Sequence, residues 1–242
     1  MNSDTLIWPA VFLGMYLFLE SLDWGLSLAA PFVARNQEEN KAVLSLLKPG
    51  IDLNEVWLIF GLSLVASAVP AAAGGAMHDS VMAMLSVAVV GGALRILAAF
   101  FKNVFGSALI LKGMSLYSVL ALFVIGLSGG AMVTGGNLMS GVGIVLSLWL
   151  ILACFQLAAL YGAVKIVNPL GERCRAAFLV SSILQLVFFL CMAFLLKGDI
   201  ADGPLSGFFW IGLAVSSVLS IAAFFLARMR RTIIALAALY IS

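Results

Sequence analysis

The sequence predicts an all-α membrane protein, a transmembrane bundle of about seven or eight spans. Of its 242 residues, 64% are hydrophobic and 10% are charged, whereas soluble domains average about 45–50% and 25%. The apolar residues also form long runs, and crossing a hydrocarbon core of about 30 Å takes about 20 apolar residues. Because backbone amides in lipid must bond within their own segment, these continuous runs predict helices and not alternating barrel strands.

Seven runs are long enough to cross a bilayer. They cover residues 6–33, 56–77, 80–101, 114–134, 141–164, 176–196 and 205–227. The first run lacks a basic leading region, so we do not expect a removable signal peptide. An eighth run, Thr232 to Ser242, is too short to cross by itself. The loops between runs are short, which predicts a single transmembrane helical domain over residues 1–242.

The basic residues alternate between the two sides of the predicted bundle. Eleven of the 13 lysines and arginines lie in the loops after odd-numbered runs, while the opposite side has only Lys197. The remaining one, Arg95, lies inside the third run. Since cytoplasmic loops are enriched in lysine and arginine, we expect these loops inside and the N-terminus outside. The excess of basic residues behind the net charge of +2 is therefore explained by membrane topology and does not predict nucleic-acid binding.

Two carboxylates, Glu20 and Asp23, interrupt the first run. Their spacing puts them on one face of a helix, and a charged face in a membrane must look at protein or water. Without a partner, the pair could take up and release protons as a relay. Paired with Arg95, it would be ionised and structural, although one arginine cannot neutralise two carboxylates. Arg95 could also extend its side chain to the membrane surface, so both readings remain open.

A second acidic pair, Asp52 and Glu55, opens the second run and is followed by Trp57. Helix capping explains acids at this position, and tryptophan is typical of the membrane interface. The first and second runs are also antiparallel neighbours. We therefore expect that the second pair could lie below the first, forming an acidic ladder from the cytoplasm to mid-membrane. Capping and relay roles are compatible.

The remaining polar residues predict packing, and none predicts a metal site. Gln156 and Tyr161 in the fifth run and Gln185 in the sixth are expected to make interhelical hydrogen bonds, each worth about 1 kcal/mol. The three cysteines are scattered without metal-ligand spacing, and there is one histidine. We therefore expect this chain to bind no metal and no haem alone.

The two acidic motifs, residues 20–25 (ESLDWG) and 52–59 (DLNEVWLI), resemble subunit II of the cytochrome bd quinol oxidases. Arg95 with Lys102 is similar to the arginine-bearing third helix of that family. On this resemblance, Glu20, Asp23 and Asp52 are the family's acidic positions, and Glu55 and Trp57 complete its second motif.

The resemblance implies a non-haem subunit of a respiratory quinol:oxygen oxidoreductase, not catalytic alone, in a bacterial or archaeal cytoplasmic (inner) membrane. It would pack against subunit I, which carries haems b and d, and help to conduct protons from the cytoplasm. Some members also bind a structural quinone, and small accessory subunits, quinone and lipids are further partners. The alternatives are a small proton-coupled secondary transporter and a structural membrane anchor of another quinol-dependent complex.

Overall fold

The computed structural model describes residues 4–47, 106–133, 139–166, 169–200 and 206–241. Between residues 48 and 105 it describes only scattered helical residues, alone or in runs of two or three, within two stretches, 57–64 and 82–101. Three of the candidate residues, Asp52, Glu55 and Arg95, lie outside the described residues. Every regular element in the described part of the chain is a helix, which confirms the all-α prediction.

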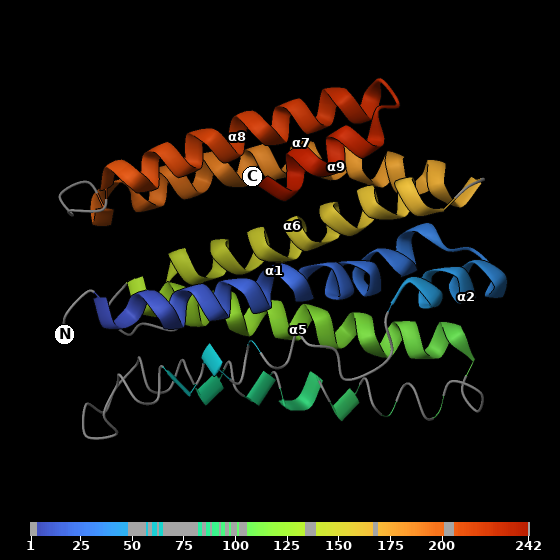
Figure 1. Cartoon of the computed structure of the whole chain (residues 1–242), viewed down its shortest axis with the longest axis horizontal. Coiled ribbons are helices and arrows are strands. Elements are labelled where there is room, and N and C mark those ends of the chain that lie inside the picture. Colours follow the sequence, from blue (N-terminus) through green and yellow to red (C-terminus); the bar gives the residue numbers. More distant parts are fainter. Residues whose placement is uncertain are drawn as a thin grey trace.

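Five long helices follow the predicted runs and lie roughly alongside one another (Figure 1). They are α1 (Asp4–Val33), α5 (Ser107–Val133), α6 (Gly141–Lys165), α7 (Pro169–Ile200) and α8 (Ser206–Arg228). α7 begins at Pro169, earlier than its predicted run, because proline suits the first turn of a helix, where no backbone donor is needed. Within the described residues, three helical segments are long and apolar enough to cross a membrane: Ser107–Gly130, Gly141–Lys165 and Pro169–Cys191.

Two short helices complete the described part of the fold. α2 (Gln37–Leu46) lies between two predicted runs, in a segment that the sequence predicts to be a loop. Its N-cap is Asn36, whose side chain accepts a hydrogen bond from the backbone N–H of Glu39. α9 (Thr232–Ile241) has 10 residues, about 15 Å of helix, and packs back against α6 and α8.

α6 lies at the centre of the described bundle and packs against α1, α5 and α7. Its contact with α1 is close at Gly25, where a Cβ atom would lie 2.0 Å from the carbonyl oxygen of Cys154. Small residues at such crossings allow two membrane helices to approach each other. The same crossing buries Trp24 and Leu122 in one apolar cluster with Cys154. α1 is thereby held deep in the bundle.

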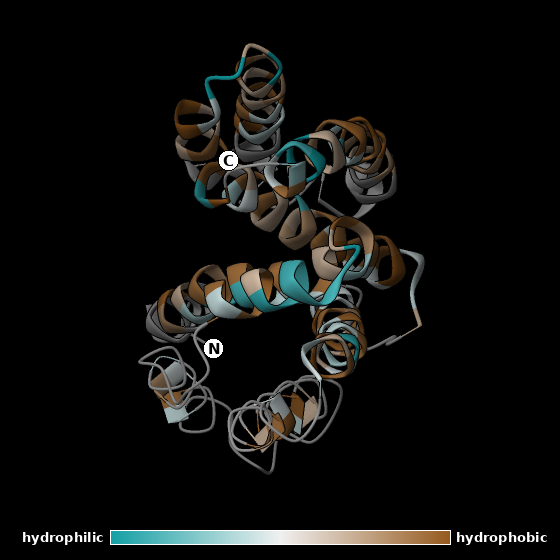
Figure 2. Ribbon diagram, turned by 90° about the vertical axis from the view of Figure 1, so that its right-hand side faces the viewer, coloured by the Kyte–Doolittle hydropathy of each residue, from teal (hydrophilic) through white to brown (hydrophobic). Residues whose placement is uncertain are grey.

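Polar residues gather at one end of the bundle. In Figure 1 the right-hand end holds the last turns of α1, α6 and α8, the first turns of α5 and α7, and all of α2. Figure 2 views this end, and hydrophilic residues are concentrated on α2 and on the turn between α8 and α9. The flanks of the helices are largely apolar. This pattern is typical of a bundle whose sides face lipid and whose end faces water.

Candidate functional site

The structure buries both carboxylates of the first motif inside the protein. The side chain of Glu20 is 1% exposed and that of Asp23 is 9% exposed. Both lie near the middle of α1, on the side that faces other helices and away from lipid. The backbone carbonyl of Asp23 accepts a hydrogen bond from the Ser27 hydroxyl at 2.9 Å. The first motif therefore forms a polar face in the interior, as its spacing predicted.

A small cavity adjoins Asp23. It measures about 10 Å³, close to the smallest volume that holds one water molecule. Three hydroxyl-bearing residues line it with Asp23: Ser27, Tyr117 and Ser118. Each hydroxyl donates to a backbone carbonyl, which for Tyr117 is that of Val87 at 2.6 Å. Because a hydroxyl oxygen keeps two acceptor sites while donating, these groups could also accept hydrogen bonds from a water or from a protonated carboxyl.

The third predicted span contributes to the wall of this cavity. Gly91 and Leu94 both line it. A Cβ at position 91 would lie 2.0 Å from the Tyr117 hydroxyl, so only glycine lets the tyrosine pack here. Arg95, the predicted counter-charge, follows Leu94 in the sequence and lies outside the described residues.

Trp57 lies against the first half of α1. Its ring stacks at a tilt on Phe12, with 5.4 Å between the ring centroids, and packs against the cluster that contains Tyr16 and Trp24. Phe12 precedes Val33 by 21 residues, about 30 Å along the helix. Trp57 therefore contacts the half of α1 that lies away from the polar end of that helix.

A second cavity, of about 250 Å³, is lined by residues of α1, α5, α6, α7, α8 and α9. Four buried polar atoms of its lining residues have no hydrogen-bond partner within the part of the chain that the structure describes. They are Nε1 of Trp24, Nε1 of Trp149, Nε2 of Gln156 and Oε1 of Gln185. The predicted interhelical hydrogen bonds are not made by these atoms of the two glutamines. Because an unsatisfied buried polar atom costs about 1–3 kcal/mol, the cavity suits a polar occupant.

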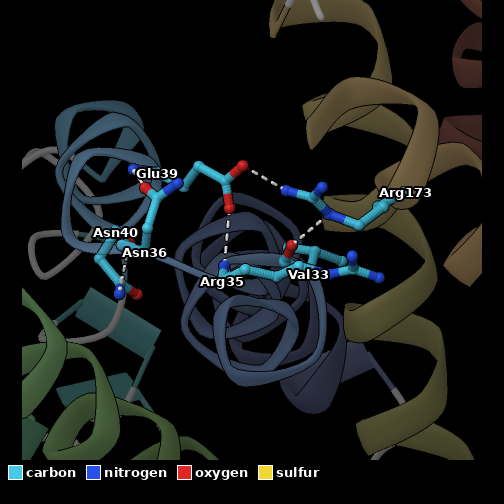
Figure 3. A network of polar contacts seen from close by, with 6 residues as sticks. All are labelled: Val33, Arg35, Asn36, Glu39, Asn40 and Arg173. Carbon is cyan, nitrogen blue, oxygen red and sulfur yellow. Dashed lines mark hydrogen bonds and ion pairs between the residues drawn. The ribbon is translucent and has the colours of Figure 1, made fainter. Parts of the chain in front are cut away.

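A third polar cluster ties three helices together at the polar end (Figure 3). The Glu39 carboxylate accepts from the Arg35 backbone N–H at 2.6 Å and forms an ion pair with Arg173. Arg173 also donates from Nε to the carbonyl oxygen of Val33 at 2.7 Å. The Arg35 N–H bond, and then Arg173, lower the pKa of Glu39 from its ordinary value of 4.5. The cluster therefore joins the end of α1 and the start of α2 to the first turn of α7.

The sequence does not predict this cluster as a whole. The spacing of Asn36 and Glu39 was a visible signal, because a capping residue followed three positions later by glutamate marks a helix start. The pairing with Arg173 had no local signal, since 134 residues separate the two side chains.

Within the described ranges, no group of three histidine, cysteine, aspartate or glutamate side chains is placed to hold a metal ion. Cys154 and Cys174 are buried in separate apolar clusters. His78 lies outside the ranges that the structure describes.

The apolar helices and the interior carboxylates define a helical integral membrane protein. The family model of cytochrome bd terminal oxidase subunit II matches residues 5–242. The chain belongs to this family, which confirms the resemblance of the two acidic motifs. It is similar to cytochrome bd ubiquinol oxidase subunit 2 of Bacillus subtilis (strain 168), at 35% identity over 60 residues. That match covers 25% of this chain and 18% of the relative, so it spans less than a fifth of the relative's length.

Proposed function

We propose that this chain is the non-haem subunit II of a quinol:oxygen oxidoreductase in a respiratory chain. The observation that carries this proposal is the family match over residues 5–242. The subunit would pack against a haem-bearing subunit I, which holds haems b and d, with small accessory subunits as further candidate partners. The complex would lie in a bacterial or archaeal cytoplasmic membrane.

We further infer that the chain crosses the membrane seven or eight times with its N-terminus outside. The support is that the basic residues of α2, of the α6–α7 junction and of the α8–α9 turn share one end of the bundle (Figure 1). Since lysine and arginine are retained on the cytoplasmic side, this end is the cytoplasmic one in the proposal.

The proposed role of the acidic motifs is to carry protons from the cytoplasm toward the oxygen-reducing site. Support comes from the burial of Glu20 and Asp23 and from the water-sized cavity at Asp23. A carboxylate beside hydroxyls and one water can pass a proton along hydrogen bonds, because each group both donates and accepts. Asp52 and Glu55 would extend this relay, and Arg95 would supply the counter-charge. Trp57 would hold the second motif against α1, where its ring packs on Phe12.

The 250 Å³ cavity fits the head group of a structural quinone, which some members of the family bind. The indole N–H groups of Trp24 and Trp149 and the Gln156 amide are donors without partners in the described structure, and they suit the carbonyl oxygens of a quinone ring. Gln185 Oε1 would accept from a ring hydroxyl of the reduced form. A bound quinone would supply a redox-active ring at this position. The protein's own groups would bind and orient it.

The experiment that tests the proposed function is purification of the native complex under mild detergent. We expect the chain to co-purify with a larger haem-bearing membrane subunit, and the visible spectrum of the complex to show b- and d-type haem bands. Isolation of the chain alone, with substrate uptake after reconstitution into liposomes, would support a secondary transporter instead. Co-purification with a quinol-dependent complex that lacks these haem bands would favour the anchor role.

A further inference from the structure

A large apolar groove runs along the outside of the bundle from its polar end. It has a volume of about 830 Å³ and is bordered by α1, α5, α6 and α7. Its walls include side chains that point away from the protein, such as Phe32 at 76% exposed and Val180 at 66% exposed. In a bilayer these side chains would face hydrocarbon. The groove is therefore open toward lipid, unlike the interior cavities at Asp23 and Gln156.

Two arginines, Arg35 and Arg173, border the groove at its polar end. Arg173 is balanced by the carboxylate of Glu39. The guanidinium of Arg35 takes part in none of the ion pairs among the described residues, because the only bond from Arg35 to Glu39 is made by its backbone N–H. Figure 3 shows both side chains on the same side of α1. Among the described residues, the end of the groove thus carries one positive charge that no ion pair offsets.

We propose that this groove binds an anionic phospholipid, with an acyl chain along the apolar walls and the phosphate at Arg35 and Arg173. Arginine suits this role because its planar guanidinium can give two parallel hydrogen bonds to phosphate oxygens. Basic pockets between membrane helices on the cytoplasmic side are known to take anionic lipid head groups. The apolar walls of about 830 Å³ require a ligand with a long hydrocarbon part, which separates a lipid from free phosphate.

Two substitutions test separately the positive charge at the end of the groove and the volume of the groove. Arg35→Gln removes the guanidinium but keeps the backbone bond to Glu39, so the Glu39–Arg173 cluster should remain folded. Ala176→Trp fills the groove near Arg173 without changing any charge, since Ala176 is an exposed residue of the groove wall. Arg231→Gln is the matched control, because Arg231 is exposed at the α8–α9 turn and does not line the groove.

The test reconstitutes the purified native complex into vesicles with equal parts of phosphatidylglycerol and phosphatidylcholine. After re-extraction in mild detergent, native mass spectrometry counts the bound lipids. We expect phosphatidylglycerol to be enriched, and Arg35→Gln to lower this enrichment about fivefold, the typical effect of one basic residue at a membrane surface. Ala176→Trp should lose the bound lipid, and Arg231→Gln should match the unmodified complex. Added inorganic phosphate should not displace the lipid.

Equal enrichment in the Arg35→Gln complex would overturn the proposal, as would bound lipid unchanged by Ala176→Trp. A photo-crosslinker at Val180 gives an independent reading, because it should label lipid. Labelling of a partner subunit alone would show that the groove is a protein interface and would also overturn the proposal. All of these outcomes measure bound lipid and not enzyme activity. They therefore test the lipid site whether or not the complex is an oxidase.

Discussion

The close crossing of α1 and α6 at Gly25 makes a strong prediction for Gly25→Ala. The added Cβ would lie 2.0 Å from the carbonyl oxygen of Cys154 and 2.7 Å from the Cβ of Ala158. Comfortable carbon contacts are about 3.5–4.0 Å. Because the nearest atom belongs to the backbone of α6, it cannot rotate away, and the helices must separate by more than about 1 Å.

The cost of this separation follows from its place in the fold. Overpacking a close-packed interior typically costs about 1–3 kcal/mol, and a rigid backbone neighbour puts Gly25→Ala near the upper value. For a chain of this size, about 3 kcal/mol corresponds to a fall in Tm of about 6–12 °C. Asp23 lies two residues away, so proton-linked activity should also decline.

The assay is thermal unfolding of the purified complex, followed by tryptophan fluorescence. Gly14→Ala is the control, because it lies on the same helix and a Cβ there would meet no atom of the described residues within 4 Å. Alanine is the better helix former by about 1 kcal/mol, so Gly14→Ala should leave Tm unchanged or slightly raised. Equal Tm values for the two variants would refute the close crossing.

Three further predictions address the polar groups. The lowered pKa of Glu39 means that its carboxylate stabilises the fold fully above pH 4.5 and that this contribution is lost as the pH falls through the lowered pKa. Glu39→Gln should therefore lower Tm at neutral pH and remove part of the acid-dependent fall. Gln156→Leu and Gln185→Leu should reduce the quinone extracted from the purified complex, because each removes an amide that would bind the quinone ring. Tyr117→Phe should slow quinol-dependent turnover several-fold, since it removes a hydroxyl from the cavity at Asp23.

Each of these predictions has a contrary result. An identical acid profile for Glu39→Gln and the unmodified chain would show that the ion pair with Arg173 does not stabilise the fold. Unchanged quinone content in both glutamine variants would place the quinone elsewhere. Full turnover with Tyr117→Phe would remove this hydroxyl from the proposed relay.

The long helices could be predicted from the sequence because their signal is local. A run of about 20 apolar residues specifies a helix wherever lipid surrounds it. The missed helix, α2, is different because it is short and polar, and Val43 is its one buried residue. Its cap at Asn36 was visible, but a cap alone does not show that the residues after it find a partner to pack against.

The candidate site was only partly predictable. The i,i+3 spacing of Glu20 and Asp23 fixed their shared face, since helix geometry alone decides it. The position of Trp57 depends on the path of the chain through α2, and no local pattern reports it. The pairing of Glu39 with Arg173 and the shared cavity of Gln156 and Gln185 also depend on how separate helices pack.

The most direct test of the proposed function is quinol-dependent oxygen consumption by the complex carrying Asp23→Asn. Asparagine keeps the shape of the side chain but cannot take up and release the proton. Glu38→Gln is the matched control, because it neutralises an exposed carboxylate on α2. With haem content and assembly intact, we predict turnover slower by about a hundredfold, the lower end of what a positioned proton-transfer group contributes. Turnover equal to that of Glu38→Gln would contradict a proton relay through Asp23.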